Sequence, residues 1–404
     1  MIKMFSAFTE EIDNVDAAIS GILEQLDFEN KPLMKNTLGI LHCFHEFIDS
    51  GVIKALSEKM PFDIIGITTP YVCLPNKSSS MGLMLNILTS NDANFITGLS
   101  EPIDNGGGNL AQVMEKLCDG ISAKLKEDAT SAEPSVHEPK VRMFMAYGPF
   151  MHILNINGDE FVERISSRFA NIPVFGAFAF SEEIDFSETY TLYNGESYAN
   201  AGVIAAITGN VQPSFLTIAI PEKNILHELA TVTKSTGNIL NTINGMSVED
   251  YAISKGLIEK KGDLDKLYTT PMIAKLDDGS KVIRVCIGGD GQGGAVMGGH
   301  VPEGAKIGFS IMELSDIIST SSEIAGEAVK ILDGKNLILY SCMARLEFLG
   351  PRNRELEAET ICKIMGNSQS FYYASAGGEI YPQRLPGGKV ANHLQNYSLV
   401  VCIL

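Results

Sequence analysis

Apolar runs alternate with amphipathic stretches along the first half of the chain, in an order that recurs. The run LGILHCF (38–44) predicts a strand, DSGVIKALSEK a short helix with Asp49 as its N-cap, and PFDIIGITT another strand. After a helix expected at about 108–127, VRMFMAY predicts a strand, GDEFVERISSRFA a helix and NIPVFGAFAF a strand. Gly66 and Gly176 occupy matching positions, each just inside the strand that follows a helix. This recurrence indicates a repeated supersecondary unit.

The second half shows the same order less regularly and adds turn signals. Asn194-Gly195 and Asp278-Gly279 each stand between alternating runs, which predicts a hairpin at each pair. The remaining elements are expected as a strand at 336–342, a helix at 354–365, a strand at 370–376 and a terminal strand near 396–404.

A strand, a helix and then antiparallel strands within one unit imply mixed sheets with helices packed on one face. We therefore predict an α+β fold, a layered sandwich of mixed, largely antiparallel sheets with helices outside, built by internal duplication. A doubly wound parallel sheet is the less favoured alternative. The domain boundary is expected near Pro221, which divides the chain into residues 1–220 and 221–404.

Charge and composition narrow the class of partner. The 404 residues include 45% apolar and 20% charged residues, and the formal net charge is −18. A surface with this much negative charge repels phosphate backbones and anionic lipids. We therefore expect no nucleic-acid or membrane partner. The start of the chain lacks an apolar signal core, and the seven cysteines are scattered without a Cys-x-x-Cys pair. These features predict a cytoplasmic protein with reduced thiols.

Two formal motifs carry little weight. GGDGQGG contains Gly289, Gly291 and Gly294 in the spacing of the dinucleotide fingerprint, but the AVMGGHVPEG that follows cannot begin a stable helix. A flexible hairpin or lid-like loop is the preferred interpretation. His42 and His45 lack an accompanying carboxylate motif. The sequence therefore predicts neither a metal nor a cofactor.

Cys342 is the best candidate nucleophile, because it ends an apolar strand where sites often lie. Arg345 nearby could lower the pKa of its thiol. No histidine is placed beside it by the sequence, since His300 and His393 could approach only through the fold. Two hypotheses stay open, a buried thiol that packs and the nucleophile of a cysteine-dependent hydrolase or transferase.

Arg345 follows its strand directly and must reach solvent or find an acid. The segment FYYASAGGEIYP then places a single acid, Glu379, after a run of small residues that allow close approach of another group. Arg345 and Glu379 either pair with each other or hold the carboxylate and the ammonium of a zwitterion such as an α-amino acid.

At these residues the sequence resembles the FIST family, named for F-box and intracellular signal transduction. The first half resembles its N-terminal domain through LGILHCF, DIIGITT, NIPVFGAFAFSEE and TLYNGES. The second half is similar to its C-terminal domain through VIRVCIGGD, HVPEGAKIGFSI, SCMAR, GGEI and NYS. The last three, in this order near the C-terminus, are the specific part of the resemblance.

The resemblance implies a non-enzymatic, cytoplasmic sensory protein that binds a small ligand, such as an amino acid or a related metabolite. Family members are often fused to signalling modules. None follows here before Leu404, so a separate signalling partner protein is expected. The site residues that the resemblance implies are Cys342, Arg345, Gly378, Glu379 and Asn396, with Gly176 on the N-terminal side.

Two departures from the family pattern affect the expected pocket shape. Ala344 stands where glycine is expected, and Ser398 where threonine is more usual. An interaction scaffold with a large exposed apolar patch is a third hypothesis beside the sensor and the cysteine enzyme.

Overall fold

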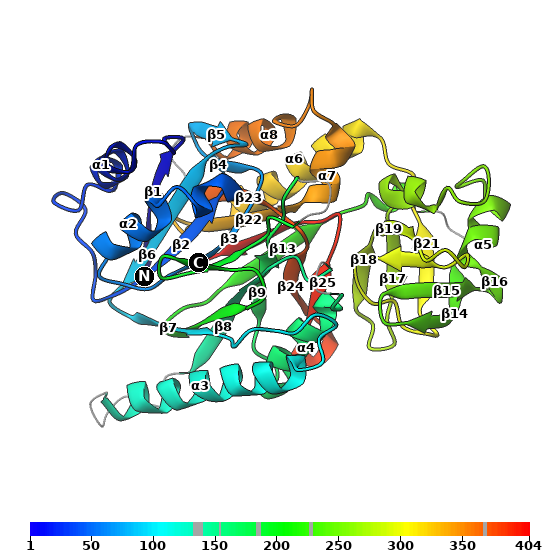
Figure 1. Cartoon of the computed structure of the whole chain (residues 1–404), viewed down its shortest axis with the longest axis horizontal. Coiled ribbons are helices and arrows are strands. Elements are labelled where there is room, and N and C mark those ends of the chain that lie inside the picture. The colour runs from blue at the N-terminus through cyan, green and yellow to red at the C-terminus, as the bar shows by residue number, and fades with distance from the viewer. Residues whose placement is uncertain (132–139, 153–154, 183–186, 226–228, 367–369) are drawn as a thin grey trace.

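Three six-stranded sheets enclose a common core, and a small antiparallel barrel lies beside them (Figure 1). The computed structural model describes residues 1–404 except 132–139, 153–154, 183–186, 226–228 and 367–369. The α+β class, the mixed sheets and the helices on the outside are confirmed.

The chain consists of three consecutive units, and each unit supplies four strands of one six-stranded sheet. Within a unit the order is an edge strand, a helix, a strand, one or two further helices, a strand parallel to the previous one, a two-stranded hairpin and a closing strand. In the first unit these elements are β1 (Ile2–Thr9), α1 (Val15–Leu26), β2 (Asn36–Cys43), the 3₁₀ helix η1 (His45–Ile48), α2 (Val52–Lys59), β3 (Ile64–Thr68), β4 (Val72–Leu74), β5 (Lys77–Ser79) and β6 (Leu83–Ser90).

The second and third units repeat this order. The second consists of β7 (Ala93–Leu99), α3 (Leu110–Ser131), β8 (Val141–Gly148), α4 (Gly158–Arg168), β9 (Val174–Phe178), β10 (Thr191–Tyr193), β11 (Glu196–Tyr198) and β12 (Val203–Gly209). The third consists of β13 (Ser214–Ile218), α6 (Leu314–Ile331), β22 (Leu337–Cys342), α7 (Met343–Leu349), α8 (Leu356–Met365), β23 (Phe371–Ala376), β24 (Glu379–Arg384), the 3₁₀ helix η4 (Pro386–Gly388), β25 (Val390–Gln395) and β26 (Leu399–Ile403). The internal repetition that the sequence predicts is therefore present in three copies.

The hairpin of each unit joins the sheet of another unit. Hairpin β4–β5 extends the third sheet through β23, β10–β11 extends the first through β3, and β24–β25 extends the second through β9. In every sheet the hairpin lies beside the parallel pair, which is β2 and β3, β8 and β9, or β22 and β23. The exchange is cyclic and interlocks the three sheets.

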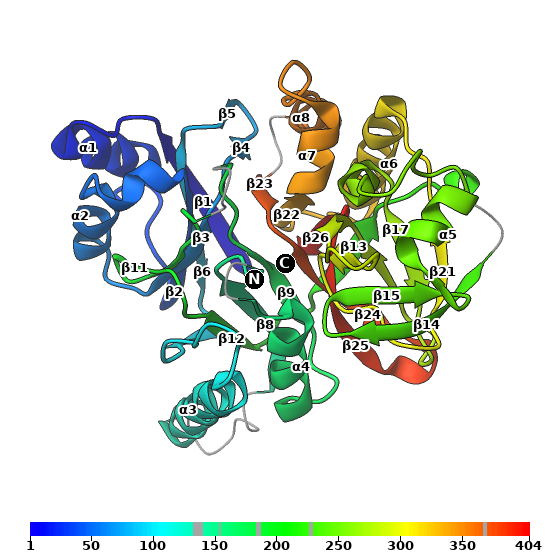
Figure 2. The ribbon, with the colours of Figure 1, turned by 45° about the vertical axis from the view of Figure 1, so that its right-hand side comes forward.

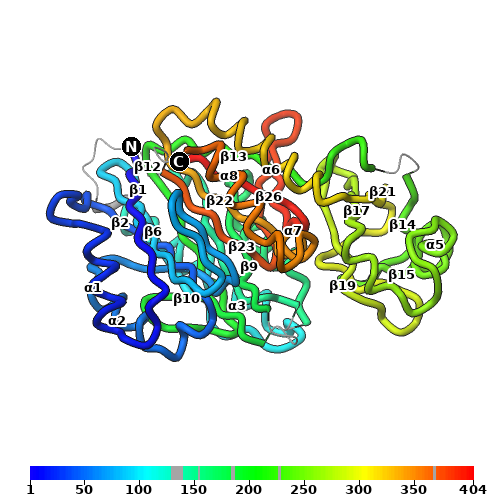
Figure 3. The backbone as a smooth tube through the Cα atoms, turned by 90° about the horizontal axis from the view of Figure 1, so that it is seen from above, coloured from blue at the N-terminus to red at the C-terminus, as the bar shows by residue number. Residues whose placement is uncertain are grey.

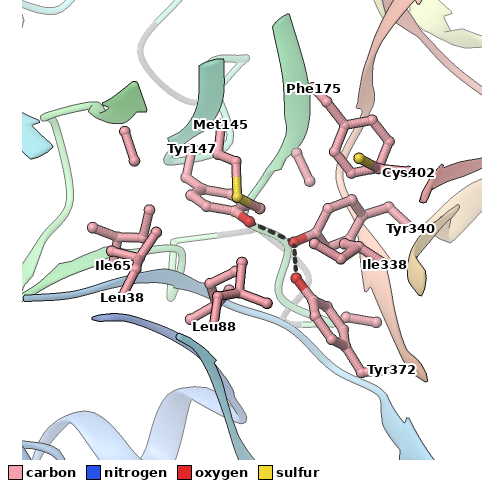
Figure 4. Close-up of a cluster of buried hydrophobic side chains, with 14 of the residues drawn as sticks. Leu38, Ile65, Leu88, Met145, Tyr147, Phe175, Ile338, Tyr340, Tyr372 and Cys402 are labelled. Atoms are coloured by element: carbon pink, nitrogen blue, oxygen red, sulfur yellow. Dashed lines mark hydrogen bonds between the residues drawn. The ribbon is translucent and has the colours of Figure 1, made fainter. Parts of the chain in front are cut away.

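The inner faces of the three sheets share one apolar core (Figure 4). A small polar cluster lies at its centre, where the hydroxyl of Tyr340 is 2.7 Å from that of Tyr147 and 3.0 Å from that of Tyr372. His42 Nε2 lies 3.2 Å from the Tyr340 hydroxyl. Burial lowers the pKa of His42 to about 3, which keeps the imidazole neutral. His42 is thus a core residue that joins the first unit to the third.

Helices cover the outer faces of the sheets (Figure 2). Helices α1 and α2 pack on the first sheet, α3 and α4 on the second, and α6 and α8 on the third. The buried residues of α1 are Ala18, Ile19, Ile22 and Leu26, the spacing of one helix face. In the parts of the chain that the structure describes, no helix combines the length and the apolar character required to cross a membrane.

The barrel is inserted in the third unit, between β13 and α6 (Figure 3). It comprises the 3₁₀ helix η2 (Glu222–Asn224), β14 (Ala230–Thr236), β15 (Ile239–Ile243), β16 (Met246–Ser247), α5 (Val248–Ser254), the 3₁₀ helix η3 (Leu264–Thr269), β17 (Met272–Lys275), β18 (Lys281–Arg284), β19 (Cys286–Gly289), β20 (Ala295–Met297) and β21 (Lys306–Phe309). It has an apolar core of its own. Because β13 pairs with β26, residues on both sides of Pro221 contribute to the third sheet, and the division into 1–220 and 221–404 stays a prediction.

The predicted turns are confirmed. Asn194 and Gly195 have φ values of 49° and 87° and connect β10 to β11. Gly279 has a φ of 86° between β17 and β18. The glycine-rich run is a hairpin loop between β19 and β20, as preferred, in which the Asp290 carboxylate accepts from the backbone N–H groups of Gln292 and Gly294.

Two local predictions are corrected. Helix α2 begins after Gly51 and not after Asp49, because the intervening residues form the turn that follows η1. Helix α7 was not expected from the sequence; it starts directly after the strand residue Cys342 and ends before Gly350, where φ is 72°. Gly66 and Gly176 do occupy equivalent positions, opposite Leu41 in β2 and Ala146 in β8.

Candidate functional site

A cavity of about 380 Å³ lies between the barrel and the three-sheet body. The second unit contributes Phe150, Phe180 and Glu182, and the third contributes residues at the end of β22, in α7 and after β23 and β25. The barrel closes the other side. The lining residues are Phe150, Phe180, Glu182, Tyr268, Val285, Ile287, Gly298, Cys342, Met343, Ala344, Glu347, Gly377 and Asn396.

A buried ion pair holds the barrel against the body beside this cavity. Arg284 of β18 donates from one guanidinium nitrogen to Asp159 Oδ1 at 2.8 Å and from another to the Leu394 carbonyl at 2.8 Å. The side chains of Arg284 and Asp159 are 2% and 8% exposed. The backbone N–H of Ile283 adds a 2.8 Å bond to Gln395 Oε1. The wall that the barrel supplies is therefore held by an ion pair and by hydrogen bonds to the body.

Helix α7 presents two different faces. Met343, Ala344 and Glu347 line the cavity, which is the spacing of one helix face. Arg345 lies outside the lining and is fully buried among α6, α7 and α8. Its Nε and one terminal nitrogen donate to Glu357 Oε1 at 2.9 and 2.6 Å.

The environment of Arg345 corrects the pairing with Glu379 that the sequence suggested. The guanidinium pairs with Glu357 of α8 and not with Glu379, and it also donates to Ser321 Oγ at 2.9 Å and Thr320 Oγ1 at 3.1 Å. Burial alone would lower the pKa of Arg345, but the Glu357 carboxylate raises it above its usual value. Arg345 is therefore a structural cation whose donors are already used.

Glu379 lies behind the cavity wall, next to Cys342. Its carboxyl is fully buried, accepts from Ser398 Oγ at 2.7 Å, and has an Oε1 atom with no partner among the described residues. Burial raises the pKa of Glu379 well above its usual value. Burial, and then the charge of Glu379, raise the pKa of the Cys342 thiol in the same way. Both groups are expected to carry their protons near neutral pH.

Asn396 is a polar residue of the lining whose amide oxygen is enclosed by its neighbours. The residue is 3% exposed, and its Oδ1 atom has no hydrogen-bond partner among the described residues. A Cβ at Gly298 would lie 2.6 Å from that oxygen, so the oxygen packs against Gly298 and a larger residue there would collide with it. The backbone N–H of Asn396 donates to the Ile283 carbonyl at 3.2 Å, which ties the residue to the barrel.

The implied site residues thus separate into four groups. Cys342 and Asn396 line the cavity, Glu379 and Gly378 lie directly behind its wall, and Arg345 belongs to the buried network on the far side of α7. Gly176 sits in β9 beside β24, where a Cβ would approach the Ala146 carbonyl oxygen to 1.9 Å, so the position serves sheet packing.

Sequence reasoning missed most of the cavity wall. Phe150, Phe180 and Tyr268 come from loops and a 3₁₀ helix, and no local pattern marks them as neighbours. The sequence did contain a signal for Glu347 as a cavity residue. It follows Met343 by four residues, so the two side chains share one face if the segment is a helix.

Thiol reactivity separates the buried cysteine from a partly exposed one. Cys362 of α8 lies 3.3 Å from Cys73, sulfur to sulfur, and the thiol hydrogen bond from Cys73 lowers the pKa of Cys362. We expect iodoacetamide at neutral pH, followed by peptide mapping, to modify Cys362 at least about tenfold faster than Cys342, since the thiolate is the reactive form. The C362S variant provides the background rate. Selective modification of Cys342 in the folded protein would reverse this expectation and favour the cysteine-enzyme hypothesis.

Known proteins were compared with the chain as a whole. The cyanuric acid hydrolase of A. caulinodans aligns with a TM-score of 0.37 and 7% identity over 100% of this chain and 98% of that chain. The T. maritima PurL structure complexed with FGAR aligns with a TM-score of 0.21 and 8% identity over 100% of this chain and 72% of that chain. No curated protein sequence matches.

Two family descriptions match the sequence itself. The FIST N domain matches residues 37–246 and the FIST C domain matches residues 251–382. The resemblance found in the sequence is thereby confirmed across nearly the whole chain. This protein belongs to the FIST family of sensory domains proposed to act in signal transduction.

Proposed function

We propose that this protein is a small-ligand sensor and that its ligand occupies the cavity between the barrel and the three-sheet body. The observation that carries the proposal is the cavity itself, which lies where the barrel meets the body and is lined mainly by apolar and aromatic side chains. The volume of about 380 Å³ is in the range of small-molecule sites and suits a metabolite of amino-acid size.

The position of the cavity supports a sensory role. Its walls come from the second unit, the third unit and the barrel, so a bound molecule contacts all three. A ligand that contacts two bodies at once favours the arrangement in which both contacts form. The proposal includes a separate partner protein that reads this arrangement, and it keeps the cytoplasmic location expected from the sequence.

The alternative function, a cysteine-dependent hydrolase or transferase, has weaker support. Glu379 does contact Cys342, but burial raises the pKa of each group. Near neutral pH the carboxyl therefore already holds its proton and cannot take up that of the thiol, and the thiol stays in its less nucleophilic protonated form.

Filling the cavity tests the proposal. In Ala344→Leu, three added carbon atoms enter the cavity from α7, where Ala344 is 2% exposed. We expect any small metabolite that raises the melting temperature of the wild-type protein to bind this variant at least about tenfold more weakly, because the space is taken. The measurement is a thermal-shift screen of amines, carboxylic acids and amino acids, followed by calorimetry of each hit.

The matched control is Ala111→Leu, at an exposed position of α3. This variant should keep wild-type affinity for every hit. Equal affinity in Ala344→Leu would place the ligand elsewhere, and a screen in which no chemical class binds would remove the support for a sensor.

A further inference from the structure

The charges around the cavity are unsuited to an anionic ligand. Among the described residues of the lining, Glu182 and Glu347 carry charge, and no lysine, arginine or histidine is present. Arg354 bridges the two carboxylates at the rim; its distance to Glu347 Oε1 is 3.7 Å. One guanidinium thus serves two carboxylates, and the group of three has an excess negative charge.

A ligand carboxylate would find no free cation here. The sequence suggested Arg345 as the residue that binds a ligand carboxylate. Its guanidinium instead donates to Glu357 and to neighbouring oxygens. A carboxylate in the cavity would also face Glu347 at close range. Removing an anion from water without a partner costs several kcal/mol. The walls therefore select against acids.

The same walls suit a cation with an apolar body. Phe150 and Phe180 pack edge to face with their ring centroids 5.3 Å apart, and Tyr268, Val285 and Ile287 complete an apolar surface. Aromatic faces attract ammonium groups. The carboxylate of Glu347 offers a counter-charge at the rim.

We propose that the cavity binds a small primary amine with an aromatic or branched apolar body, and that it discriminates against carboxylates. The proposal rests on the proposed function and names the ligand class for that same cavity. It departs from the amino-acid expectation in one respect, since the recognised group is the ammonium and the carboxylate is not bound.

Matched compounds test the class. Phenethylamine, hydrocinnamate and phenylalanine share one ring and chain and differ in carrying the amine, the carboxylate or both. Isoamylamine, isocaproate and leucine repeat the comparison on a branched aliphatic body. Calorimetry with the full-length protein at neutral pH is expected to show each amine binding at least about tenfold more tightly than its matched acid, with the amino acid between them.

One variant locates the recognised group. Glu347→Gln should weaken phenethylamine binding by roughly twofold to fivefold, because the side chain is 47% exposed and solvent screens its charge. Glu359→Gln, on an exposed position of α8, is the control that should leave the affinity unchanged.

The outcomes are distinguishable from those of the proposed function. Tight binding of the acids or the amino acids, lost in Ala344→Leu, would overturn the amine assignment while the sensor proposal stands. Binding of none of the six compounds would overturn the amine assignment, and the broader screen then decides on the sensor. Amine binding that is unchanged in Glu347→Gln would also overturn it.

Discussion

Arg345→Met is expected to destabilise the protein by about 3–5 kcal/mol, because it leaves the carboxylate of Glu357 charged, buried and without its counter-ion. Both side chains of the pair are fully buried, and the closest approach is 2.6 Å. The hydroxyls of Ser341, Ser321 and Tyr373 still donate to Glu357 in the variant, but hydroxyls do not replace a positive charge. Urea unfolding followed by circular dichroism measures the loss.

The double variant Arg345→Met with Glu357→Leu removes both charges and should recover most of that loss, since an apolar pair of similar volume is often tolerated in place of a buried ion pair. The exposed pair of Arg164 and Glu160, at 2.7 Å on α4, provides the matched control. Arg164→Met should cost less than about 1 kcal/mol. A loss below about 1 kcal/mol in Arg345→Met would show that the pair does not support the fold.

The buried pair also predicts the direction of the acid response. Burial alone would raise the pKa of Glu357, but Arg345 and the neighbouring hydroxyls bring it below its usual value. A carboxyl whose pKa is lower in the folded state contributes stability above its unfolded pKa and loses that contribution as the pH falls through the folded pKa. The stability advantage of the wild type over Arg345→Met should therefore shrink in acid.

Gly176→Ala is expected to destabilise the protein by about 3 kcal/mol or more, at the upper end of overpacking effects. The Cβ of alanine would lie 1.9 Å from the carbonyl oxygen of Ala146, an atom of the paired strand β8 that cannot move without breaking the parallel pair. A flexible side chain would yield at such a contact, whereas backbone does not. Urea unfolding and the yield of folded protein are the measurements.

Gly120→Ala supplies the matched control for the added methyl group. Gly120 lies in α3, and a Cβ built there has no atom within 4 Å. Alanine should stabilise this helix by up to about 1 kcal/mol. If Gly176→Ala were as stable as the wild type, the two strands would have to separate more easily than their register suggests.

The fold class was predictable because local sequence patterns determine which segments form strands, helices and turns. Strands β2, β8 and β9 are short apolar runs next to amphipathic helices, and the turn pair of Asn194 and Gly195 needs left-handed backbone wherever it occurs. The exchange of hairpins was not predictable, since the alternation of residues in β10 and β11 is the same whichever sheet they join. The third copy of the unit was obscured by the barrel inserted between β13 and α6.

The site was predictable in part. Cys342 and Asn396 were selected from the sequence and line the cavity. The pairing of Arg345 with Glu379, one of the two alternatives, is not formed. Glu379 follows a run of small residues that suggested an open strand end, whereas the packing of α8 against α6 and α7 brings Glu357 to the guanidinium. The aromatic wall depends on loops from distant segments, and only the folded chain brings them together.

The cyclic exchange of hairpins has a consequence for how the chain folds. Sheet two lacks β24 and β25 until the last thirty or so residues are in place, and sheet one lacks β10 and β11 until the second unit has formed. Contacts of long sequence separation slow folding, because loop closure costs entropy before those contacts form. We therefore expect refolding to be slow and highly cooperative, with no unit stable in isolation. During synthesis, each of the first two units would emerge with an unpaired sheet edge, and the edge of the second sheet would wait for the C-terminal residues to cover it.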